Sequence, residues 1–61
     1  MIKRVQIDFI NHDDNDSICS TWYRTKGITA VEALIEAINL FVKQITENNR
    51  NYEIIAASID E

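Results

Sequence analysis

The chain contains no proline, one glycine and one cysteine among its 61 residues. A single cysteine excludes an intrachain disulfide, and no Cys/His set is present to hold a structural zinc ion. We expect Cys19 to be a small buried or half-buried residue in a reducing compartment rather than a reactive thiol. Since repeats and linker-like composition are also missing, we interpret residues 1–61 as one small domain.

Long apolar runs are missing as well. No segment approaches the ~20 apolar residues of a membrane-spanning helix, and the N-terminus has no apolar stretch of signal-peptide length. We therefore expect a cytoplasmic protein without a membrane partner. Asn15-Asp16-Ser17 matches a glycosylation motif by letter, and without a secretion signal we treat this match as chance.

Basic residues are few and scattered, with six Lys and Arg against ten Asp and Glu, for a formal net charge of −4. Contacts to phosphates need clustered Lys and Arg, so the composition argues against a direct nucleic-acid partner. A domain of this size buries only about 60% of the surface that its unfolded chain exposes. Association with another molecule is therefore a remaining source of stability.

Alternating apolar and polar residues predict two strands joined by a turn. Residues 3–10 place Val5, Ile7 and Phe9 on one side of a strand, and residues 17–25 are rich in residues that favour strands. Between them lies a run of Asn, His and Asp that is typical of a turn. This turn lacks the glycine and glutamate of a calcium loop, so we expect no metal ion there, and we interpret its His12 as a solvated residue.

The register of this hairpin decides which residues of its second strand face the core. One register places Phe9 opposite Ile18 and Val5 opposite Trp22, so that Trp22 points into the core. A shift by one residue buries Tyr23 instead. We prefer the first register, because Trp22 offers more apolar area and the Tyr23 hydroxyl needs water or a partner.

A helix is predicted from Thr29 to about Glu47. Thr29 and Glu32 have the spacing of a capping box, and Gly27 eases the corner before it. We expect one apolar stripe of the helix to cover the sheet; it consists of Val31, Leu34, Ile38, Phe41 and Ile45 and is widened by Ala30, Ile35, Ala37 and Val42. Leu40 falls on the charged side, among Glu32, Glu36, Lys43 and Glu47, and should be exposed.

After the helix ends near Asn48 and Asn49, a third strand is predicted over Tyr52 to Ile59, with apolar residues on both of its sides. The right-handed crossover rule places this strand parallel to the second one, beside the first. The sequence thus predicts an α+β fold of ββαβ type. Its three-stranded sheet has the order 2-1-3, with the first strand antiparallel to both neighbours and one amphipathic helix packed on one face.

The uncovered face of the predicted sheet is the candidate binding surface. Besides Gln6 and Cys19, it should carry the residues that we predict to bind a partner, which are Arg4, Asp8, Ile10, Thr21, Tyr23, Tyr52 and Ile54. Aromatic residues among polar ones suit the centre of a protein interface. Burial of the third strand on both sides would also suit a contact at this face.

The residue pattern gives no support to catalysis. A nucleophile with a base would need Cys19 or a serine near His12, and no orienting group or glycine-made oxyanion site accompanies them. An acid–base pair would need one carboxyl group with a pKa raised by burial, whereas Asp13, Asp14 and Asp16 should lie in water. Because a phosphate-binding glycine loop is missing too, we expect a non-enzymatic protein without a cofactor.

The helix opens with TAVEALIEA, from Thr29 to Ala37, and the final strand reads YEIIAASI, from Tyr52 to Ile59. With the hairpin before them, these segments give an order of elements that resembles small phage proteins of ββαβ layout. Such proteins bind and inhibit host enzymes, and they include blockers of host RNA polymerase and anti-defence inhibitors. The resemblance implies a small acidic protein that binds a larger protein and inhibits or regulates it during host takeover or anti-defence.

Two alternatives stay open beside this inhibitor hypothesis. The two-sided apolar character of the third strand also fits a homodimer or larger homo-oligomer that binds or sequesters a small molecule between its subunits. The acidic charge also fits a mimic of nucleic acid that occupies a basic groove on another protein.

Overall fold

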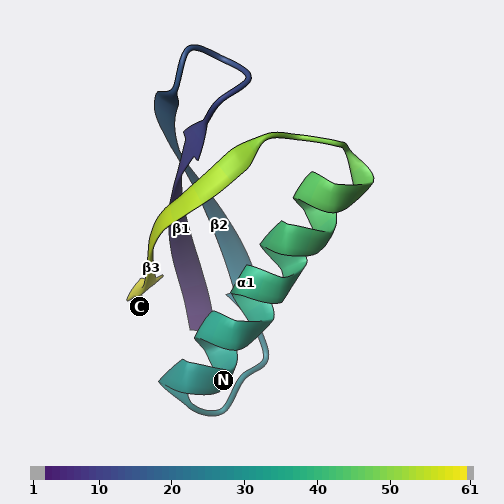
Figure 1. Ribbon diagram of the computed structural model, residues 1–61. Helices are drawn as coiled ribbons and strands as arrows, with labels where there is room; N and C mark the ends of the chain where they lie inside the picture. Colours follow the sequence, from purple (N-terminus) through teal and green to yellow (C-terminus); the bar gives the residue numbers. More distant parts are fainter. Residues whose placement is uncertain (1–2, 61) are drawn as a thin grey trace.

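The computed structural model describes residues 3–60. Its elements are β1 (Lys3–Asn11), β2 (Ser17–Thr25), α1 (Ala30–Glu47) and β3 (Tyr52–Asp60). The strands form one sheet of order β2-β1-β3, β1 is antiparallel to both neighbours, and α1 crosses one face (Figure 1). The predicted α+β, ββαβ architecture with sheet order 2-1-3 is confirmed.

Helix α1 starts and stops at the predicted residues. The N-cap Thr29 accepts a hydrogen bond from the Glu32 backbone N–H at 3.2 Å, and its hydroxyl donates to the Glu32 carboxylate at 3.0 Å. At the other end Asn48 is the C-cap, and Asn49 adopts a left-handed φ of 53°. No helix within residues 3–60 is long and apolar enough to cross a membrane.

The core lies between β1 and α1. Its buried hydrophobic side chains come from alternate positions of β1 and from one stripe of the helix, and they are Val5, Ile7, Phe9, Ala33, Ala37 and Phe41. The ring centroid of Phe9 lies 5.0 Å from that of Phe41 and 4.7 Å from that of Tyr52. Aromatic pairs at such distances add stability beyond the area they bury.

Gly27 marks a close approach between the β2–α1 connection and the helix. A Cβ atom on this residue would lie 2.5 Å from the backbone nitrogen of Ala33 and 2.9 Å from its Cα. Gly27 does not have a positive φ. The corner therefore needs glycine for space rather than for a special backbone conformation.

The face that α1 turns toward the sheet differs from the predicted stripe. Leu34, Ile38, Phe41 and Ile45 are buried or pack against the core as expected. The prediction that Val31, Ile35 and Val42 cover the sheet was wrong, since these side chains are 64%, 54% and 45% exposed. Ala30 is exposed too. The small residues Ala33 and Ala37 occupy the centre of the contact, because they let the helix approach the sheet closely. Leu40 is exposed, as predicted.

The predicted register of the β1–β2 hairpin was wrong by one residue. Val5 pairs with Tyr23, and Gln6 pairs with Trp22. Tyr23 therefore faces the helix, whereas Trp22 faces the other side of the sheet. The Tyr23 hydroxyl donates a 2.6 Å hydrogen bond to the Gln44 side-chain oxygen, so burial of the ring leaves the hydroxyl satisfied. Partial burial also raises the pKa of Tyr23.

The turn explains this register. Asn15 and Asp16 have φ values of 53° and 56°, which are left-handed conformations that Asn and Asp tolerate better than most residues. They complete a turn from His12 to Asp16 and allow Asn11 to pair with Ser17. Since turn length and geometry fix the pairing of a hairpin, every side chain of β2 is assigned to its face by these residues.

A bulge in β3 explains the apolar residues on both of its sides. Phe9 pairs with Ile54, but the preceding Asp8 pairs with Ala56, so Ile55 is an extra residue without a partner on β1. The bulge lets both Ile54 and Ala57 pack against the core while Ile55 stays 51% exposed.

Candidate functional site

The face of the sheet opposite α1 is the candidate functional site, which we call the open face. Strand pairing and the alternation of side chains assign to it Arg4, Gln6, Asp8 and Ile10 from β1, Ile18, Ser20, Trp22 and Arg24 from β2, and Glu53, Ala56, Ser58 and Asp60 from β3. Because α1 covers only the other face, the described residues leave these side chains accessible to a partner.

Three of the predicted partner-binding residues, Arg4, Asp8 and Ile10, lie on the open face. The prediction placed four others on the wrong side, namely Thr21, Tyr23, Tyr52 and Ile54. Thr21 pairs with the buried Ile7, and the remaining three pack against the core. Cys19 lies on that side too and is half-buried, as expected of a structural cysteine.

The one-residue change of register brings two large apolar side chains of β2 to the open face that the prediction had turned inward. Trp22 is 50% exposed and Ile18 is 76% exposed. Across the sheet Ile18 pairs with Ile10. The signal that would have identified them is the pair of left-handed-tolerant residues at the end of the turn.

Polar groups at the centre of the open face are already paired with each other. The Asp8 carboxylate accepts hydrogen bonds from the Gln6 amide at 2.8 Å and from the Ser20 hydroxyl at 2.7 Å. The bond from Gln6, followed by that from Ser20, lowers the pKa of Asp8. Nearer one end, the Arg4 guanidinium bonds the Asp60 carboxylate through two nitrogens. The centre is thus charged and held in place by its own hydrogen bonds.

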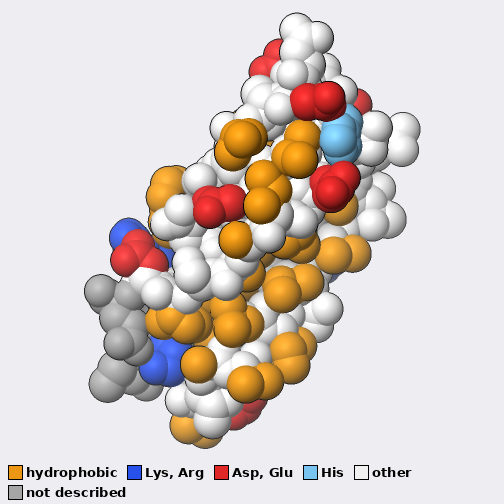
Figure 2. All heavy atoms as spheres, turned by 60° about the vertical axis from the view of Figure 1, so that its left-hand side comes forward, with side chains coloured by type: hydrophobic (Ala, Val, Ile, Leu, Met, Phe, Trp, Pro, Cys, Tyr) orange, Lys and Arg blue, Asp and Glu red, His pale blue; other side chains and the backbone are white. Residues whose placement is uncertain are grey.

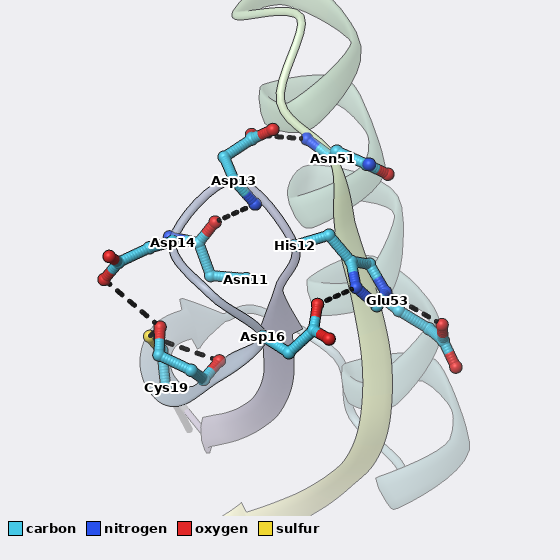
Figure 3. A network of polar contacts seen from close by, with 9 residues as sticks. Asn11, His12, Asp13, Asp14, Asp16, Cys19, Asn51 and Glu53 are labelled. Atoms are coloured by element: carbon cyan, nitrogen blue, oxygen red, sulfur yellow. Dashed lines mark hydrogen bonds and ion pairs between the residues drawn. The ribbon is translucent and has the colours of Figure 1, made fainter.

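A second polar cluster lies at the tip of the hairpin (Figure 3). His12 contacts the Asp16 carboxylate through Nδ1 at 2.6 Å and the Glu53 carboxylate through Nε2 at 3.1 Å. Asp16, and then Glu53, raise the pKa of His12. His12 lies exposed in the turn, as predicted, but the sequence analysis missed that both of its ring nitrogens have partners.

The same cluster joins the hairpin tip to the start of β3. The His12 backbone N–H donates to the Asn51 carbonyl, and the Asn51 N–H donates to the Asp13 carboxylate, both at 2.9 Å. Cys19 is hydrogen-bonded to Ser17. No group of three or more His, Cys, Asp or Glu side chains between residues 3 and 60 could hold a metal ion. The hydrogen bonds of the cluster make it a structural clasp between the hairpin tip and the start of β3.

Comparison of the chain with protein-family models, with curated proteins and with solved structures found no match. The open face, which presents a half-exposed tryptophan beside a hydrogen-bonded polar centre, is the surface that best suggests a function.

Proposed function

We propose that this chain is a non-enzymatic protein-binding domain that docks on a larger protein through the open face and thereby inhibits or regulates it. The half-exposed Trp22 on that face is the observation that carries the proposal. In keeping with the resemblance to phage inhibitors of ββαβ layout, we propose host takeover or anti-defence as the setting.

The side chains around Trp22 support an interface of ordinary composition. Tryptophan is enriched among the few residues that dominate binding free energy, especially where neighbouring contacts exclude water. Ile18 and Ile10 supply apolar area on the same face, and Arg24 follows two positions after Trp22 at the rim. This combination of a tryptophan with an arginine matches the enrichment found in protein interfaces.

The polar centre favours a defined partner over nonspecific adhesion. Asp8 already has two hydrogen-bond donors within the chain, so its orientation is fixed before binding. A partner that buries this carboxylate must supply further donors, or it suffers the cost of an imperfectly satisfied charge. The open face should therefore select a protein that presents an apolar pocket for Trp22 beside hydrogen-bond donors.

The proposal is tested by capture from a lysate of the source organism or of its host, followed by titration of the purified partner. Trp22 is the only tryptophan of the chain, so its fluorescence reports directly on this face. We expect a blue shift on binding. Trp22→Ala should weaken affinity about 30-fold or more, the factor that corresponds to a hot spot of about 2 kcal/mol.

Ile28→Ala is the matched control, because Ile28 is exposed but lies in the connection before α1, away from the open face. It should bind the partner like the wild type. The proposal fails if no partner is retained at a stoichiometric level, or if Trp22→Ala and Ile28→Ala bind it equally well.

A further inference from the structure

The apolar side of α1 extends beyond the part that the sheet covers. Val31, Ile35, Ile38 and Val42 follow one another at helical spacing and form what we call the apolar flank. Ile38 packs partly against the core, and the other three are among the most exposed large hydrophobic residues of the helix. Such a row differs from a single exposed residue, because it forms a continuous strip of uncovered hydrophobic surface.

Side-chain contacts establish which strand lies below each side of the helix. Glu36 accepts from the backbone N–H of Lys26, just after β2, and Gln44 accepts from Tyr23 of β2. The polar side of α1 therefore lies toward β2, and the apolar flank lies toward β3. Figure 2 shows hydrophobic side chains gathered in a band along this part of the surface.

The neighbouring strand β3 has a free edge, because among the described strands it pairs only with β1. Natural edge strands are usually protected by charged residues, proline or a β-bulge. β3 has a bulge at Ile55, but its residues 54–59 include no charged residue and no proline, and its charged residues Glu53 and Asp60 stand near its ends. The other edge strand, β2, runs below the side of α1 that carries Glu36, so within residues 3–60 only the β3 edge combines free backbone groups with apolar cover.

We propose that a second copy of this chain binds here, with β3 pairing antiparallel to the partner's β3 and the two apolar flanks meeting on the same side of the joined sheet. An antiparallel pair of identical strands has a two-fold axis, so the same surface serves both copies. The strand edge and the flank then come together in one self-complementary interface. The acidic residues of the β2 side of α1 stay outside it, and the two acidic residues of β3, Glu53 and Asp60, are already paired with His12 and Arg4, which limits repulsion between two chains of net charge −4.

The size of the surface fits a small dimer. The nine residues of β3 span about 30 Å, and the flank from Val31 to Val42 spans about 16 Å. Together they offer on the order of 600 Å² per chain, which reaches the lower end of stable protein interfaces at about 1,200 Å² in total. Residues 3–60 of the monomer include only six buried hydrophobic residues, so this burial would add substantially to its core.

Sedimentation velocity from about 1 μM to about 1 mM tests the proposal over the range of weak to moderate Kd values. We expect the mass to rise from 7.1 kDa to twice that value. Ile35→Lys should weaken association at least about tenfold, since it places a charge in the flank. Val31→Lys, at a more exposed position of the same flank, gives a second test in case the first variant folds poorly; circular dichroism checks both.

Leu40→Lys is the matched control, because it makes the same change of charge at an exposed leucine outside the flank. It should dimerise like the wild type, as should Trp22→Ala, so this proposal and the proposed function can fail independently. Hydrogen exchange should show β3 amides that are protected in the dimer and exchange faster in Ile35→Lys. A single-chain mass throughout the range, loss of the dimer in Trp22→Ala, or equal effects of Leu40→Lys and Ile35→Lys would overturn the proposal.

Discussion

Replacing Gly27 by alanine should destabilise the fold, although the same change often stabilises a protein where the backbone angles permit it. Alanine reduces the freedom of the unfolded chain, which is worth about 0.4–1 kcal/mol in favour of folding. Against this gain, the new Cβ would lie 2.5 Å from the Ala33 backbone nitrogen. Overpacking of this kind costs about 1–3 kcal/mol, because the helix start has to move. We therefore expect a net loss of about 1–2 kcal/mol in the free energy of unfolding.

This loss is measurable because the total free energy of unfolding is small. At about 0.05–0.15 kcal/mol per residue, the 61 residues give a free energy of unfolding of about 3–9 kcal/mol. With a urea slope of about 1 kcal/mol/M, the midpoint should fall by about 1–2 M. The assay is urea unfolding followed by far-UV circular dichroism, at one fixed protein concentration so that self-association does not alter the comparison.

Ile28→Ala provides the control, because Ile28 is 85% exposed next to Gly27. Its free energy of unfolding should change by no more than about 0.5 kcal/mol. An unchanged or raised urea midpoint in Gly27→Ala would refute the reasoning, since it would show that the helix start adjusts to the methyl group at no significant cost.

Phe41→Ala should cost about 3–5 kcal/mol, because its buried ring packs against Phe9; a thermal melt like that of the wild type would contradict this. The raised pKa of His12 means that its contribution to stability is fully present below pH 6.5 and is lost as the pH rises through that raised pKa. His12→Gln should therefore flatten the pH dependence of the urea midpoint above pH 6.5, and identical profiles would exclude the effect. The contribution of Asp8 to stability depends on pH in the opposite direction: it is present above pH 3.8 and is lost as the pH falls through the lowered pKa of Asp8. An NMR titration of Gln6→Ala should find the Asp8 pKa raised relative to the wild type, and an unmoved pKa would remove Gln6 as its main cause.

The elements and their order were predictable because each has a local cause. Period-two alternation marked β1, the spacing of Thr29 and Glu32 marked the helix start, and Asn48 with Asn49 marked its end. The crossover rule then left β1 as the central strand. None of these inferences needed knowledge of which side chains touch across the core.

It was harder to predict which residues of β2 and α1 face the core, because this depends on fine geometry. Whether Trp22 or Tyr23 points inward depends on two left-handed residues in the turn, and the larger apolar area of Trp22 was the wrong criterion. The bonded hydroxyl of Tyr23 shows that a polar group at the edge of the core is tolerated when a partner such as Gln44 lies within reach.

The helix stripe was misjudged for a related reason. Hydrophobicity alone cannot distinguish a residue that packs closely from one that merely shares an apolar arc, and it ranked Val31 above Ala33. Close packing against the sheet selected the smaller residue, because a short side chain brings the helix nearer. The same choice left three large residues of the arc exposed.

The two neighbours of β1 differ greatly in the length of chain that separates them from it. The hairpin needs only a short turn, whereas the pair Arg4 and Asp60 joins residues 56 positions apart. Closing the longer loop loses more chain entropy, and contacts of high sequence separation form slowly. We expect the hairpin to assemble early and β3 to dock last. β3 would then also be the first strand to detach in partial unfolding. The hydrogen bonds at the hairpin tip would still hold its first residues to the hairpin.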